Sequence, residues 1–308
     1  MPIYKQNGEV LTPIKEKKLD LERTIQTLVE ANLDGVFGLQ FVCSEYPLNA
    51  LRIDTLAFDE ETTSFVVIEY KKERSFTVID QGYAYLALLL NNKADFVLEY
   101  NEKGKKNLRK DDIDWSQSKV IFVAQSFTKY QQEAIGFQDL PIELWEVKKY
   151  DDNLVSFNQI RASEKSESIK TVTKNKVIER VSQEIKQYSV GDHIKSEWNE
   201  SRELFEELVT QVQQLDQRFE VHPVKSHIGF KLGNKNVINV APGKTRIRID
   251  LLRTKPEDIK DPEHRVKYVE NSFKYWNQHV STVNITNAED IAYAMLLIKQ
   301  VYKRFIES

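Results

Sequence analysis

Two acids and a base stand close together in one apolar part of this 308-residue chain. Glu69 and Lys71 lie two residues apart in SFVVIEYKK, which has the composition of a β-strand, and Asp54 lies in the preceding segment LRIDTLAFD. Side chains alternate between the two faces of a strand, so Glu69 and Lys71 project from the same face. A hairpin that turns near residues 60–63 would place Asp54 roughly opposite them. The sequence therefore predicts two carboxylates and an ammonium at one end of a sheet.

This combination of groups is suited to the hydrolysis of phosphodiester bonds. A hard divalent cation such as Mg²⁺ binds a few carboxylate oxygens and keeps several water ligands. A lysine beside the ion can orient or deprotonate an attacking water and can offset the charge of a phosphate. The alternative is an exposed ion pair on a hairpin, because a D…ExK pattern also recurs by chance.

A third carboxylate could come from the helical segment that precedes the sheet. Glu22 lies in LDLERTIQTLVEANL, and a helix over this segment would lead into the sheet. Asp20 and Glu30 lie nearby and could take its place. We expect one of these acids to meet the metal.

Three further polar residues flank the predicted site. Arg52 shares a strand face with Asp54. Gln81 and Tyr85 are spaced i, i+4, so they lie on one face of the helix predicted after Lys71. An amide in such apolar surroundings is costly unless it has a partner, which favours a role for Gln81.

The quoted residues resemble a known superfamily. Glu22, RID (52–54), IEYK (68–71) and QGYAY (81–85) resemble the PD-(D/E)xK phosphodiesterase superfamily over about residues 15–135, and most closely its mismatch-endonuclease-like branch. The chain as a whole is similar to an uncharacterised bacterial family labelled "predicted transport protein". The proline of the superfamily motif is missing, because Asp54 follows Arg52 and Ile53.

The resemblance implies a role for each matching residue. Asp54 and Glu69 would be metal ligands and Lys71 the catalytic lysine. Glu22 would be an auxiliary catalytic acid and a further metal ligand. The resemblance also implies a catalytic or orienting role for Gln81 and substrate binding by Arg52 and Tyr85.

The function implied is that of a Mg²⁺- or Mn²⁺-dependent endonuclease that acts on DNA in restriction, phage defence or repair. One alternative is a nuclease fold that binds nucleic acid or protein without catalysis. Another is a scaffold whose C-terminal domain does the work. The transport label fits poorly, because the longest apolar run, AYLALLL, has seven residues, whereas a bilayer-spanning helix needs about 20.

Composition indicates a globular protein of the cytoplasm without a membrane partner. Apolar residues make up 41% of the chain and charged residues 30%. Cys43 is the single cysteine, so neither a disulfide framework nor a cysteine zinc site is expected. The N-terminal sequence lacks the hydrophobic core of a signal peptide. A homodimer is an option that the sequence leaves open.

Apolar periodicity predicts an α/β fold, a restriction-endonuclease-like mixed sheet flanked by helices, over residues 1–162. We expect a helix over 19–38, a hairpin over 51–71, a helix over 78–92, strands over 95–100 and 119–127, a short helix over 128–137 and two strands over 142–160. Residues 163–200 are interpreted as a linker followed by helix. Residues 201–308 are predicted to form a smaller α+β domain, with a helix over 200–215, a three-stranded meander over 219–254 and a closing helix over 287–305.

The C-terminal domain is expected to bind a substrate or a partner. Residues 218–308 carry 16 basic and 10 acidic side chains, a net charge of +6. The basic residues of the meander are accompanied by two aromatic residues, Phe230 and Trp276. A basic sheet with aromatics can hold single-stranded nucleic acid. A protein-docking or dimerising module is equally compatible with this composition.

Overall fold

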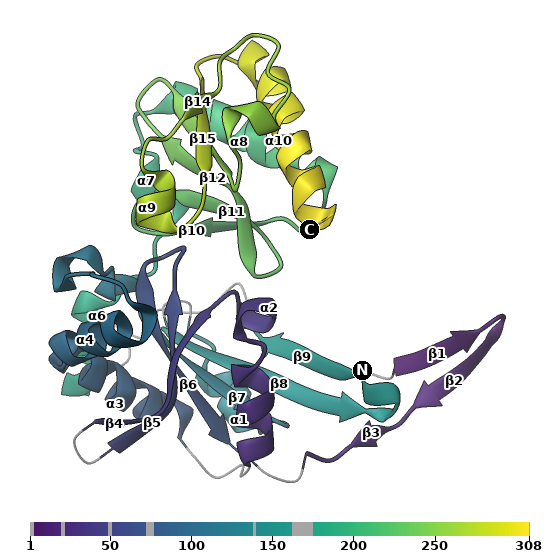
Figure 1. Cartoon of the computed structure of the whole chain (residues 1–308), viewed down its shortest axis with the longest axis vertical. Helices are drawn as coiled ribbons and strands as arrows, with labels where there is room; N and C mark the ends of the chain where they lie inside the picture. The colour runs from purple at the N-terminus through teal and green to yellow at the C-terminus, as the bar shows by residue number, and fades with distance from the viewer. Residues whose placement is uncertain are drawn as a thin grey trace. The chain divides into compact units, whose positions relative to one another are not determined.

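The computed structural model describes residues 3–19, 22–48, 51–71, 77–137, 140–161 and 175–307. The chain divides into two compact units, Met1–Lys186 and Gln187–Ser308 (Figure 1). The predicted linker, 163–200, falls partly on residues 162–174, which lie outside the described residues. In its described part, helix α6 (Lys176–Glu184) buries Ile178 and Val181 in the core of the first unit. The first unit therefore extends beyond the predicted boundary at residue 162.

The first unit alternates strands and helices along the chain. In order, its remaining elements are β1 (Ile3–Asn7), β2 (Val10–Ile14), β3 (Glu16–Lys17), α1 (Glu22–Glu30), α2 (Leu33–Phe37), β4 (Gln40–Leu48), β5 (Leu51–Asp59), β6 (Ser64–Lys71), α3 (Val78–Asn91), α4 (Lys93–Gly104), β7 (Lys119–Ala124), α5 (Lys129–Ala134), β8 (Ile142–Tyr150) and β9 (Val155–Ile160). Strands β1 and β2 pair only with each other in the described part of the chain.

The other strands of the first unit form a mixed sheet. Among the described residues it has seven strands in the order β3-β8-β7-β6-β5-β4, with β9 also paired to β8. The pairs β4–β5 and β5–β6 are antiparallel, whereas the pairs β6–β7 and β7–β8 are parallel. The hairpin predicted over 51–71 is confirmed as β5 and β6, with the turn at residues 60–63.

Helices cover both faces of this sheet, which confirms the predicted α/β architecture. Helices α3, α4 and α6 pack on one face, and α1 and α2 pack on the other. Strand β6 lies between them, and each of its residues from Ser64 to Tyr70 is buried. A strand buried on both faces reads as a continuous apolar run. Glu69 is therefore an unusual residue for its position.

One predicted element of the first unit is wrong. The segment DFVLEY, residues 95–100, was expected as a strand but forms the middle of helix α4. Its apolar residues Phe96, Val97 and Tyr100 are buried at the i, i+1 and i+4 spacing of a helix face. A short apolar run is compatible with either structure, and here the helical spacing of the buried residues decides.

The second unit is an α+β domain, as predicted. Its elements are α7 (Val190–His193), α8 (Asn199–Leu215), β10 (Glu220–Pro223), β11 (Ile228–Leu232), β12 (Lys235–Pro242), β13 (Ile247–Leu252), β14 (Lys267–Tyr268), α9 (Ser272–Trp276), β15 (Val280–Ile285) and α10 (Glu289–Glu307). Among the described residues, six strands form an antiparallel sheet in the order β10-β11-β12-β13-β15-β14. The apolar residues of α8 and α10 form one core with those of the sheet.

Two details of the second unit differ from the sequence prediction. The meander over 219–254 has four strands rather than three, because β10 pairs with β11 through residues 220–223. Phe230, proposed as a stacking residue, is fully buried in the core beneath α8. It cannot stack on a bound base, whereas Trp276 is 46% exposed.

None of the helices in the described part of the chain combines the length and the apolar character that crossing a bilayer requires.

Candidate active site

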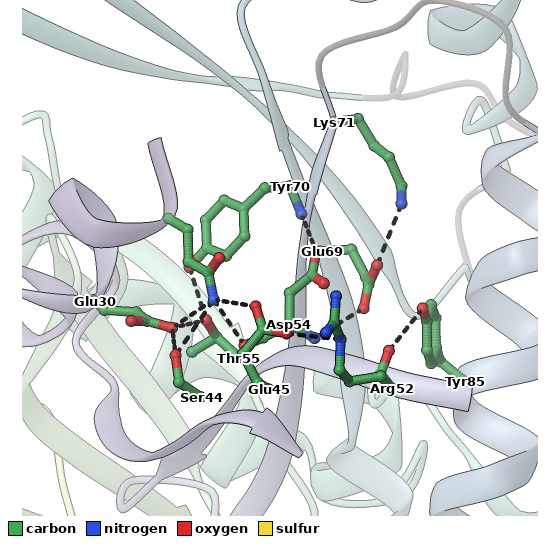
Figure 2. A network of polar contacts seen from close by, with 11 residues as sticks. Glu30, Ser44, Glu45, Arg52, Asp54, Thr55, Glu69, Tyr70, Lys71 and Tyr85 are labelled. Atoms are coloured by element: carbon green, nitrogen blue, oxygen red, sulfur yellow. Dashed lines mark hydrogen bonds and ion pairs between the residues drawn. The ribbon is translucent and has the colours of Figure 1, made fainter. Parts of the chain in front are cut away.

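Asp54 and Glu69 meet where strands β5 and β6 separate. We call this point, with Asp54, Glu69 and Lys71, the fork. The backbone ladder between these strands ends at the pair Thr55–Ile68. Beyond it, the Asp54 N–H donates to Glu69 Oε1 at 3.2 Å, and the Tyr70 N–H donates to Asp54 Oδ2 at 3.1 Å. Each carboxylate therefore binds the backbone of the opposite strand and takes the place of a ladder carbonyl (Figure 2). These bonds satisfy two backbone donors that would otherwise lack a partner at the fork.

Lys71, the last residue of β6, places its ammonium beside the Glu69 carboxylate. Its Nζ lies 3.3 Å from Glu69 Oε2. The side chain of Glu69 is 2% exposed and that of Lys71 is 20% exposed, so the ammonium lies between the buried acid and solvent. The structure thus brings together the three residues whose spacing first suggested chemistry.

The electrostatics of the fork are unfavourable for two ionised acids. Burial, and then the neighbouring Asp54 carboxylate, raise the pKa of Glu69 from 4.5 to about 7, although Lys71 acts in the opposite direction. Burial also raises the pKa of Asp54, and the Tyr70 N–H opposes this rise. One ammonium cannot balance two crowded carboxylates, so a further cation at this point would relieve their repulsion.

The residues at the fork fit a hard divalent cation such as Mg²⁺. Asp54 and Glu69 supply carboxylate oxygens, the ligands that Mg²⁺ prefers. Gln81 Oε1 is buried and has no hydrogen-bond partner among the described residues. The described residues contain no group of three or more His, Cys, Asp or Glu side chains arranged to hold a metal. An ion at the fork would therefore depend on two carboxylates and on water ligands.

Gln81 and Tyr85 lie on helix α3, as the i, i+4 spacing predicted. The Tyr85 hydroxyl donates to the backbone oxygen of Arg52 at 3.4 Å. Burial and the nearby Glu69 raise the pKa of Tyr85, which keeps its hydroxyl protonated. Tyr85 thereby connects α3 to the end of β5 that carries Asp54.

Glu22 and Arg52 lie beside the fork in a cleft next to α1. The cleft has a volume of about 670 Å³, and Asp54 also lines it. Arg52 forms an ion pair with Glu45 at 2.6 Å, and its side chain is 65% exposed. Glu22 is the first residue of α1 and does not complete a three-acid cluster with the fork residues. Its role as a metal ligand stays a prediction, and its possible substitute Asp20 lies outside the described residues.

A polar network between α1 and the strands of the sheet was not predicted from the sequence. It connects α1 to β4, β5 and β6 through five side chains: Gln26, Glu30, Ser44, Thr55 and Tyr70 (Figure 2). Two signals could have indicated it. Gln26 and Glu30 are spaced one helical turn apart, and Thr55 and Tyr70 place hydroxyls within apolar strands, where a buried hydroxyl needs a partner.

Comparison with known proteins identifies one relative along the whole chain. An uncharacterized protein of Haemophilus influenzae is 38% identical over 304 residues, which cover 98% of this chain and 100% of that protein. The chain belongs to the family of that protein. Within the second unit, residues 190–304 match the family model of a domain of unknown function, DUF5655.

Two solved structures resemble part of the chain. A repair endonuclease from Pyrococcus abyssi is 18% identical, with 43% of this chain and 49% of that chain covered and a TM-score of 0.28. A complex of EndoMS with double-stranded DNA is 17% identical, with 42% and 57% covered and a TM-score of 0.25. This chain thus spans about half the length of each.

Proposed function

We propose that this protein is a metal-dependent endonuclease that hydrolyses phosphodiester bonds of DNA and has a PD-(D/E)xK-type catalytic unit. The observation that supports the proposal most is the fork between β5 and β6, where Asp54, Glu69 and Lys71 meet. An acid that is almost completely buried beside a second acid is costly for a purely structural sheet. A cation bound between the two carboxylates would offset this cost.

In this proposal Asp54 and Glu69 would hold Mg²⁺ or Mn²⁺, and the ion would supply positive charge that stabilises a phosphate during hydrolysis. The Lys71 ammonium orients the attacking water by hydrogen bonding to it, and it offsets the charge of the phosphate. Gln81, whose amide oxygen is buried, orients the site. Arg52, whose side chain is exposed, contacts the DNA. Tyr85 is buried on α3 and supports the end of β5, so the predicted contact between Tyr85 and substrate is not part of this proposal.

The second unit would select a substrate or a partner, and the enzyme would act in the cytoplasm. Lys225, Lys244, Arg246 and Arg248 are exposed in this unit. Exposed cations of this kind attract a phosphate backbone.

Purified full-length protein is expected to cut DNA in the presence of Mg²⁺ or Mn²⁺ and to lose this activity in EDTA. The assay uses supercoiled plasmid, linear duplex, single-stranded DNA and RNA, so it also defines the substrate class. An Asp54→Asn variant purified in the same way controls for contaminating nucleases. If the protein binds DNA in a mobility-shift assay but cuts none of these substrates with either metal, it is a binding module that lacks catalysis.

A further inference from the structure

Glu30, the last residue of α1, collects several hydrogen bonds on one carboxylate oxygen. Its Oε1 accepts from the Thr55 hydroxyl at 2.5 Å, from Gln26 Nε2 at 3.1 Å and from the Ser44 hydroxyl. Thr55 is fully buried in β5. The carboxylate therefore fixes one helix and two strands at a single point (Figure 2).

The hydrogen bonds of this network have a defined direction. A threonine hydroxyl has one hydrogen, and Thr55 gives it to Glu30. The Tyr70 hydroxyl must then donate to Thr55 Oγ1, at 3.1 Å. Tyr70 is fully buried, so its hydroxyl has no access to solvent. The order is Tyr70 to Thr55 to Glu30, ending on an acceptor that can take charge-assisted bonds.

The two hydroxyl residues are chain neighbours of the fork residues. Thr55 follows Asp54, and Tyr70 lies between Glu69 and Lys71. The Tyr70 N–H also donates to Asp54 Oδ2. Because the backbone ladder ends at Thr55, side chains must hold the strands at their correct separation beyond that point.

Helix α1 makes a second connection to the same place. Gln26 Nε2 lies 3.1 Å from the backbone oxygen of Asp54, and it also lies within hydrogen-bond distance of Glu30, Ser44 and Glu45. An amide group has two hydrogens, which these acceptors share. One face of α1 is thus bound to the backbone of Asp54 directly and to β6 through Thr55 and Tyr70.

We propose that Glu30, Thr55 and Tyr70 form a brace that positions Asp54 and Glu69 to hold a divalent cation. This inference rests on the proposed function and adds positioning residues to it. The brace acts through the backbone of β5 and β6, and Glu30 lines the cleft beside α1 together with Asp54. It also assigns Glu30 a role distinct from that of the predicted third ligand, Glu22.

The test compares full-length variants by Mn²⁺ binding in isothermal titration and by the kinetics of DNA cleavage. Thr55→Val keeps the shape of the side chain and removes the hydroxyl. Tyr70→Phe breaks the same chain of bonds at its other end. Thr55→Ser restores a hydroxyl. Thr27→Val is the control, because Thr27 lines the cleft beside α1 together with Glu30, but its hydroxyl donates within α1 to the Arg23 oxygen.

Thr55→Val and Tyr70→Phe are expected to weaken Mn²⁺ binding and to lower kcat, each roughly 10- to 100-fold, as the loss of a partner that orients metal ligands does in other sites. KM for DNA should stay unchanged. Thr55→Ser and Thr27→Val should bind Mn²⁺ and cut DNA as wild type does. If the disruptive variants acted only by disturbing the packing, Thr55→Ser would also lose activity.

The brace is disproved if both disruptive variants bind Mn²⁺ as tightly as wild type. If wild type binds Mn²⁺ but does not cut DNA, the proposed function fails. The Mn²⁺ affinities of the variants then still test the brace. If wild type binds no Mn²⁺, both proposals fail.

Discussion

Replacing Lys71 by alanine is expected to slow DNA cleavage about 100-fold or more, since positioned proton-transfer groups contribute at least this much. The side chain reaches Glu69 Oε2 from the solvent side of the fork, where a water and a phosphate would approach. Its loss removes both the group that orients the water and the positive charge that offsets the phosphate. DNA binding should persist, because a duplex contacts many other cations.

Single-turnover cleavage at saturating Mg²⁺, together with a mobility-shift assay, measures the two effects separately. Lys103→Ala is the charge-matched control, because Lys103 is an exposed lysine on α4 that pairs with Glu99. It should cut DNA at the wild-type rate. Cleavage by Lys71→Ala at the wild-type rate would show that Lys71 has no catalytic role.

Replacing Glu69 by glutamine is expected to abolish metal-dependent cleavage and yet to stabilise the metal-free protein at alkaline pH. The pKa of Glu69 rises from 4.5 to about 7 in the folded protein, mainly because the side chain is buried and then because Asp54 is near. The folded state therefore binds the Glu69 proton more tightly than the unfolded state does. Glutamine keeps the size of the side chain and removes the ionisation.

The sign of the pH dependence follows from this shift. Below about pH 4.5 Glu69 is protonated in both the folded and the unfolded state, so it does not lower the free energy of unfolding. As the pH rises from 4.5 to about 7, the unfolded state loses its proton first, so the folded state loses stability relative to it. Well above pH 7 Glu69 is ionised in both states, and the free energy of unfolding is lower by on the order of 3 kcal/mol, at 1.36 kcal/mol per pKa unit.

Urea denaturation in EDTA at pH 8 and at pH 4.5 checks this result. Glu69→Gln should be more stable than wild type at pH 8, and the difference should largely vanish at pH 4.5. Glu102→Gln, a change at an exposed acid on α4, is the control and should match wild type at both values. A Glu69→Gln protein that is less stable than wild type at pH 8 would mean that Glu69 is a stabilising residue of the fold.

The fork between β5 and β6 could be predicted because short-range rules determine it. Strand alternation places Glu69 and Lys71 on one face, and a short turn sets Asp54 opposite Glu69. Glu69 also stood out by itself, as an acid within a strand that is otherwise apolar and buried. The helix predicted over 287–305 is a similar case, because the side chain of its first residue, Asn287, accepts the Asp290 N–H at the start of α10.

Other features depend on contacts between distant parts of the chain. The brace joins Glu30 to Thr55 and Tyr70, and the local sequence of α1 does not indicate these partners. Phe230 has the composition of a stacking residue, but its burial depends on α8 packing over the sheet. Local sequence patterns also did not decide between strand and helix for residues 95–100, where tertiary packing fixes the structure.

Crystals grown or soaked with Mn²⁺ test the central claim most directly, because Mn²⁺ scatters anomalously and accepts the same oxygen ligands as Mg²⁺. The account predicts an anomalous peak at the fork, within about 2.1 Å of carboxylate oxygens of both Asp54 and Glu69. A fork without a peak, or a peak bound elsewhere by acids that exclude this pair, would contradict it.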